Sequence, residues 1–111
     1  MTSVLMIDDD GDRADRLGQA LTERGYRVTR AEGCEAAVAH LRDRERQYDL
    51  VILWINGRHG SPCEALRELQ HAGRTAGLRE APLFLCVSHG HLGIDAQLRI
   101  ERMGARYAWE E

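Results

Sequence analysis

The chain has 111 residues with a formal net charge of −3, and all fifteen of its Lys+Arg residues are arginine. The absence of lysine excludes Schiff-base chemistry and a P-loop lysine, because a guanidinium stays protonated and cannot act as an amine nucleophile. With 43% hydrophobic and 30% charged residues, the composition predicts a single folded domain over residues 1–111. A pI near 5.9 argues against a nucleic-acid-binding surface, which is usually basic.

The cysteines and the N-terminus bear on the cellular compartment. The three cysteines, Cys34, Cys63 and Cys86, form no CxxC pair and leave one thiol over. We therefore expect reduced thiols in a cytoplasmic protein. The first residues do not follow a signal-peptide pattern, and no apolar run reaches membrane-spanning length, so we expect no membrane insertion.

The first half of the chain predicts two strand–helix pairs. Residues 4–7 form a short apolar strand, and the next helix ends at Gly25 after an apolar stripe of Ala14, Leu17, Ala20 and Leu21. Residues 27–31 form the second strand. The helix after it has a stripe of Ala37, Val38 and Leu41, and the charged run 42–46 is typical of a solvated helix end.

The second half of the chain repeats the alternation. Residues 50–55 are apolar without interruption, which is typical of a central parallel strand covered on both faces. The third helix begins with a capping box formed by Ser61, Pro62 and Glu64. After a strand at 83–88, a fourth helix ends at Gly104, and its apolar residues are Ile94, Leu98 and Met103. The last predicted strand is 106–109. This alternation predicts an α/β fold, a doubly wound parallel sheet of five strands.

Three acids follow the first strand directly: Asp8, Asp9 and Asp10. In an open α/β sheet, ligands bind at the carboxyl ends of parallel strands. Repulsion between the carboxylates must be relieved by a cation, by hydrogen bonds or by protonation of one acid. A polar turn followed by helix-capping acids is the structural alternative.

Four segments together resemble a bacterial response-regulator receiver domain. They run in order over essentially the whole chain: VLMIDDD at 4–10, DLVILWING at 49–57, APLFLCVS at 81–88 and MGA at 103–105. The resemblance implies a flavodoxin-like sheet of order 2-1-3-4-5 and a role in two-component, phosphorelay-like signal transduction. In that family, a histidine kinase transfers a phosphoryl group to an aspartate on the third strand, beside a magnesium ion.

The resemblance assigns the family's site residues only in part. Asp8 and Asp9 match its acid pair, and Asn56 matches the residue whose backbone carbonyl completes the metal site. The phosphoacceptor position is occupied by Trp54, whose indole can neither attack phosphorus nor coordinate a hard cation. Any magnesium binding is therefore expected to be weak.

The positions that read out phosphorylation are also altered. Ser88 best matches the family's hydroxyl residue, with Val87 as the alternative. Tyr107 is the candidate switch aromatic, although Ala108 is the match without a gap. The family's lysine falls at about Glu111, where the charge is reversed. We interpret the chain as a degenerate receiver, or pseudo-receiver, that is not an enzyme and acts by protein contacts without phosphorylation.

A metal or small-ligand sensor is the alternative function. Its candidate ligands lie in the loops after the third and fourth strands, beside the two acids: His59, Cys63, His89 and His91. Imidazole, thiolate and carboxylate groups suit zinc, although the spacing matches no standard site. An enzyme that pairs Ser88 with His89 is disfavoured, because adjacent residues at a strand end point apart.

The family's fifth helix is missing from the predicted elements. In the fold that the resemblance implies, this helix covers the same sheet face as the first helix. We therefore expect the strands at 4–7 and 50–55 to be partly bare on that face, with Trp109 covering some of it. The expected explanation is a homodimer, or a chain that is the N-terminal part of a longer protein with an output domain.

Overall fold

Five strands and four helices alternate along residues 2–43, 46–55, 62–75 and 81–110, which are the parts of the chain that the computed structural model describes. In chain order they are β1 (Ser3–Ile7), α1 (Gly11–Glu23), β2 (Arg27–Ala31), α2 (Cys34–Arg42), β3 (Leu50–Ile55), α3 (Pro62–Thr75), β4 (Leu83–His89), α4 (Ile94–Arg102) and β5 (Arg106–Glu110). The strands form one parallel sheet in the order β2-β1-β3-β4-β5. The predicted flavodoxin-like fold is therefore confirmed.

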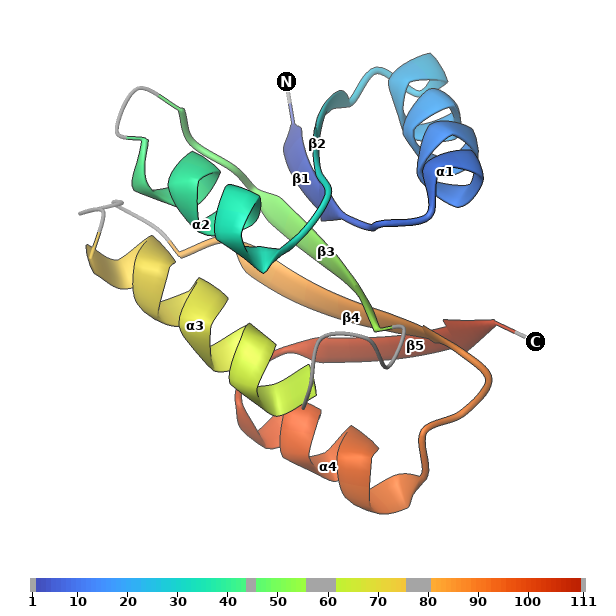
Figure 1. Ribbon diagram of the computed structural model, residues 1–111, viewed down its shortest axis with the longest axis vertical. Helices are drawn as coiled ribbons and strands as arrows, with labels where there is room; N and C mark the ends of the chain where they lie inside the picture. The colour runs from blue at the N-terminus through green and yellow to red at the C-terminus, as the bar shows by residue number, and fades with distance from the viewer. Residues whose placement is uncertain (1, 44–45, 56–61, 76–80, 111) are drawn as a thin grey trace.

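The helices cover the two faces of the sheet unequally. Helix α1 lies on one face, whereas α2, α3 and α4 lie on the other (Figure 1). The larger core lies between the sheet and these three helices, and its fully buried residues include Leu5, Val51, Leu66, Leu69 and Ile100. A smaller core under α1 is formed by Val4, Met6, Ala14, Ile52 and Trp54.

The bare surface expected without a fifth helix does not lie over β1 and β3. On the α1 face of β3, Ile52 and Trp54 are only 4% and 7% exposed. They are buried because Leu17 and Leu21 of α1 pack against the same cluster. The uncovered part of this face lies on β4 instead, where Leu83 is 63% exposed.

Trp109 does not cover that surface either. Its ring centroid lies 5.6 Å from that of His91, which also contacts Tyr107 edge-on. Tyr107 packs against the larger core, and side chains two residues apart on a strand share a face. Trp109 therefore lies on the face of α2, α3 and α4, and the expectation that it shields the bare strands is wrong.

Two of the predicted helices differ in detail. In α4 the fully buried residue is Ile100, whereas Leu98 is 40% exposed because it lies about 200° around the helix from Ile100. Helix α2 ends at Arg42 with Asp43 as its C-cap, so the charged run begins at the helix end, and residues 44–45 of the run lie outside the described residues. Helix α3 begins at Pro62 as predicted, but its expected cap, Ser61, lies outside the described residues. None of the helices described is both long and apolar enough to cross a membrane.

Candidate functional site

The carboxyl ends of β1 and β3 bring Asp8 and Trp54 together. Ile7 lies beside Leu53 in the register of these two strands, so the next residues along the strands are neighbours. Both are buried, with 2% of Asp8 and 7% of Trp54 exposed. Because α1 begins three residues after Asp8, its first turn lies at this same edge of the sheet.

Arg13 of α1 neutralises Asp8 through two parallel hydrogen bonds. Its Nε donates to Oδ2 of Asp8 at 2.8 Å, and its Nη2 donates to Oδ1 at 2.6 Å. The Asp8 side chain is fully buried, and that of Arg13 is 19% exposed. The hydrogen bond to Asp8 raises the pKa of Arg13. A bidentate guanidinium–carboxylate pair is among the strong polar contacts of proteins, so the charge of Asp8 is balanced from within the chain.

The same guanidinium stacks on Trp54. The Cζ atom of Arg13 lies 4.0 Å from the centroid of the indole, which is a cation–π contact. A planar guanidinium can bind a carboxylate through its edge and an aromatic ring through its face. The indole Nε1 is buried and has no hydrogen-bond partner among the described residues. Trp54 thus acts here as an aromatic support for Arg13.

The arrangement around Asp8 does not fit a magnesium ion. Such an ion would sit about 2.0–2.1 Å from a carboxylate oxygen. Both oxygens of Asp8 are already approached by the nitrogens of Arg13, and Oδ1 also accepts from the backbone N–H of Asp10 at 3.0 Å. Asp9 is half-buried at the same edge, and Asn56 lies outside the described residues.

The third acid of the run, Asp10, is the N-cap of α1. Its Oδ1 accepts from the backbone N–H of Arg13 at 3.2 Å. This hydrogen bond is the main reason why the pKa of Asp10 is lowered. For Asp10, the structural alternative of a capping acid therefore holds, and the cap fixes the turn from which Arg13 reaches Asp8.

Replacing Asp10 with alanine is expected to lower the melting temperature by about 2–5 °C near pH 7. A lowered pKa means that the ionised cap stabilises the fold above its ordinary value of 3.8 and that this stability is lost as the pH falls below it. The deficit of the variant should therefore be smaller near pH 3 than near pH 7. Circular dichroism melts at the two pH values test this, with Asp15→Ala of the same helix as the control; a deficit of equal size at both would contradict it.

Ser88 and Tyr107 form a second group at the end of β4. Ser88 is 1% exposed, and its Oγ lies 2.8 Å from the carbonyl oxygen of Gly90 and 2.6 Å from the hydroxyl of Tyr107. The backbone N–H of Leu92 donates to that hydroxyl at 3.0 Å. Since Ser88 has one proton, which it donates to Gly90, the proton between the two hydroxyls belongs to Tyr107. The chain of bonds connects the loop after β4 to β5.

The alternatives to these two residues lie on the opposite face. Val87 pairs in register with Trp54 and with Ala108, so the three share the α1 side of the sheet. Of the four candidate residues, Ser88 and Tyr107 are the ones that offer hydroxyl groups to the loop. Their role in a conformational switch stays a prediction.

Replacing Tyr107 with phenylalanine is expected to lower the free energy of unfolding by about 1–2 kcal/mol. The change removes one oxygen that both accepts and donates, and it leaves the Leu92 N–H and the Ser88 Oγ without that partner. Urea denaturation followed by circular dichroism measures the difference. Tyr26→Phe, at a residue that is 37% exposed, is the matched control. Equal stability of the Tyr107 variant and the natural chain would contradict the assignment.

The candidate zinc ligands do not converge in the described part of the chain. No three His, Cys, Asp or Glu side chains among the described residues could hold a metal ion, and His59 lies outside those residues. Both nitrogens of His91 are used, because Nδ1 accepts from Gly93 at 2.8 Å and Nε2 lies 2.8 Å from Oε1 of Gln97.

The other two candidate ligands also lie apart from Asp8. His89 is exposed, and Cys63 packs against the larger core. Burial in that core, together with the nearby Cys63, raises the pKa of the Cys86 thiol to about 12. A zinc site that combines these candidate ligands with His59 stays a prediction.

The residue that the sequence analysis missed is Arg13. A signal was present, because Arg13 is the third residue of α1 and a cation is disfavoured by the helix dipole in the first turn. A buried acid five residues earlier, which accepts its hydrogen bonds, offsets that disadvantage.

The solved structures that resemble this chain share one fold. No protein-family model matches the chain, and no curated protein matches it either. It is similar to a solved two-component response regulator from Clostridium difficile, with a TM-score of 0.82 and 21% identity over 99% of this chain and 84% of that one. A CheY-like response regulator receiver domain from Methanospirillum hungatei has a TM-score of 0.79 and 21% identity, over 99% and 82%. Chemotaxis protein CheY4 of Vibrio cholerae has a TM-score of 0.75 and 19% identity, over 99% and 85%. The chain therefore has the fold of response-regulator receiver domains.

Proposed function

We propose that the chain is a receiver-type module of bacterial two-component signalling that works in the cytoplasm without phosphorylation, through contacts with a protein partner. The observation that carries the proposal is the position of Arg13, which binds Asp8 through its edge and Trp54 through its face. In this proposal the module is not an enzyme, because the polar groups described at the carboxyl edge bind one another.

Phosphoryl transfer to a protein requires a nucleophile and cations that neutralise the phosphoryl oxygens. Trp54 supplies no nucleophile, and the chain contains no lysine, since all fifteen of its Lys+Arg residues are arginine. Asp8 is the acid that a metal would need, but it is bound by Arg13. The cation that the acid pair of a receiver binds from outside is thus replaced by the guanidinium of Arg13.

The proposed partner is a protein. The two most exposed large apolar side chains among the described residues lie on separate elements, Leu83 at 63% on the face of α1 and Ile94 at 66% on α4. The net charge of −3 gives no support to nucleic-acid binding. A second copy of the chain is the first partner to test, and light scattering on the purified chain should report a dimer; a monomer would direct the search to a different protein.

Incubation with acetyl phosphate and magnesium tests the absence of phosphorylation. Intact-mass measurement should show no added phosphoryl group, because Trp54 cannot form an acyl phosphate. A receiver domain that retains its third-strand aspartate, treated in parallel, is the positive control. A hydroxylamine-sensitive phosphoryl group on Asp8 or Asp9 would overturn the proposal.

A further inference from the structure

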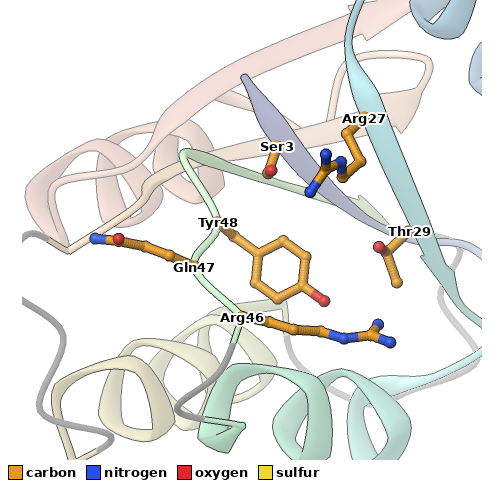
Figure 2. Close-up of a pocket in the computed structure, with 6 residues that line it drawn as sticks. All are labelled: Ser3, Arg27, Thr29, Arg46, Gln47 and Tyr48. Carbon is orange, nitrogen blue, oxygen red and sulfur yellow. The ribbon is translucent and has the colours of Figure 1, made fainter. Parts of the chain in front are cut away.

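A separate pocket lies at the amino ends of the strands, at the opposite end of the sheet from Asp8. It has a volume of about 370 Å³, and we call it the amino-edge pocket (Figure 2); its lining residues are Ser3, Arg27, Thr29, Arg46, Gln47 and Tyr48. Ser3 begins β1, Arg27 begins β2, and residues 46–48 precede β3. We propose that the amino-edge pocket binds the phosphate group of a small organic phosphate.

The first observation is an unpartnered hydroxyl inside the pocket. Tyr48 is 4% exposed, and its hydroxyl is buried without a hydrogen-bond partner among the described residues. Figure 2 shows that this hydroxyl points into the space between Thr29 and the guanidinium of Arg46. Buried polar groups in proteins nearly always have a partner, and an oxygen of a bound anion would provide one.

The second observation is the charge around that hydroxyl. Arg27 and Arg46 extend toward the space from β2 and from the segment before β3 (Figure 2). In the described structure, the Arg27 side chain has neither a hydrogen bond nor an ion pair. Arg46 has a distant pair with Asp43, at 3.7 Å, and an interaction with the Tyr48 hydroxyl that is the main cause of its raised pKa, although this contact does not reach hydrogen-bond geometry at the hydroxyl. Both guanidinium groups therefore retain donors for an anion.

An acid beside the pocket does not cancel these charges. Asp49 lies next in the chain, but it is not among the lining residues, and its Oδ2 accepts from the backbone N–H of Ser3 at 2.8 Å. Its carboxylate is thus held by the start of β1. Among the described residues that line the pocket, two are cations and none is an acid.

The arrangement of donors selects a phosphate over a carboxylate. A single arginine fork satisfies a planar carboxylate. Here two guanidinium groups, the Tyr48 hydroxyl and the Thr29 hydroxyl surround one space from different elements (Figure 2), which suits the several oxygens of a tetrahedral anion. The volume of about 370 Å³ exceeds that of the phosphate alone and lies at the lower end of small-molecule sites, roughly 300–1,000 Å³. The rest of a small phosphate monoester would occupy the remaining space.

Backbone NMR of the full chain tests the proposal directly. Inorganic phosphate and glycerol 3-phosphate are titrated at constant ionic strength, with acetate in a separate arm. The amide signals of Ser3, Thr29 and Gln47 should shift saturably with either phosphate and not with acetate. Tyr48→Phe and Arg46→Gln should each weaken the affinity about tenfold, because each removes a donor to a charged group. Tyr26→Phe and Arg16→Gln are matched controls that should leave it unchanged.

Thermal melts give an independent reading of the same variants. In chloride, Tyr48→Phe should melt at or above the temperature of the natural chain, because it removes a hydroxyl without a partner. In phosphate the order should reverse, since only the natural chain gains stability from binding. Absence of saturable shifts, equal binding of acetate, or equal phosphate affinity of Tyr48→Phe would each overturn the proposal. These outcomes are separate from the test with acetyl phosphate, which concerns the opposite edge of the sheet.

Discussion

Replacing Arg13 with alanine is expected to lower the free energy of unfolding by about 2–4 kcal/mol. The substitution leaves Asp8 buried with its negative charge unpaired, and it removes the guanidinium from the face of Trp54. The expected loss of unfolding free energy lies toward the lower end of the range for broken buried ion pairs, because the Arg13 side chain is 19% exposed. Urea denaturation near pH 7 measures it.

Three comparisons make this result specific to the ion pair. Arg16→Ala, at an exposed position of the same helix, should change the stability by less than about 0.5 kcal/mol. Combining Arg13→Ala with Asp8→Asn should be less harmful than the sum of the two single changes, by roughly 1–3 kcal/mol of coupling. Magnesium should stabilise Arg13→Ala but not the natural chain. Additive effects of the two changes would show that Arg13 does not neutralise Asp8.

Replacing Trp54 with alanine is expected to cost about 3–5 kcal/mol of unfolding free energy. Trp54 is 7% exposed and is the largest side chain of the smaller core, so its loss leaves a cavity beneath α1 and removes the aromatic contact of Arg13. Trp54→Phe keeps an aromatic face and should cost about 1–2 kcal/mol. Thermal and urea unfolding of both variants measure these differences.

Trp109→Ala is the control for the loss of an indole. Trp109 is 48% exposed, so its removal should cost less than about 1.5 kcal/mol. Trp54→Asp should fold poorly, because it places a second carboxylate beside the buried Asp8. Restoration of phosphorylation by Trp54→Asp alone would contradict the view that Arg13 and the missing lysine also block the reaction.

The fold was predictable because its signals are local in the sequence. The uninterrupted apolar segment Leu50–Ile55 is β3, the central strand, and the alternation of strands and helices indicates a parallel sheet. The order of its strands was implied by the resemblance to receiver domains. The position of Trp54 at the end of β3 also followed from sequence.

The details of the site depend on packing between elements that the sequence pattern does not encode. Arg13 reaches Asp8 because α1 lies across the ends of β1 and β3, and the same packing buries strands that were expected to be bare. Trp109 faces away from the bare surface because the alternation of β5 places it with Tyr107. The pocket around the Tyr48 hydroxyl is formed by residues of β2 and of the segment before β3, which are distant in the sequence.

We propose that the guanidinium of Arg13, paired with Asp8, takes the place of the metal ion that a receiver binds. Backbone NMR of the natural chain before and after addition of magnesium and beryllofluoride tests it most directly. We predict that the amide signals of Asp8, Asp9, Trp54 and Ser88 stay unchanged. Saturable shifts of these signals, of the kind that a receiver with its third-strand aspartate undergoes, would contradict the claim.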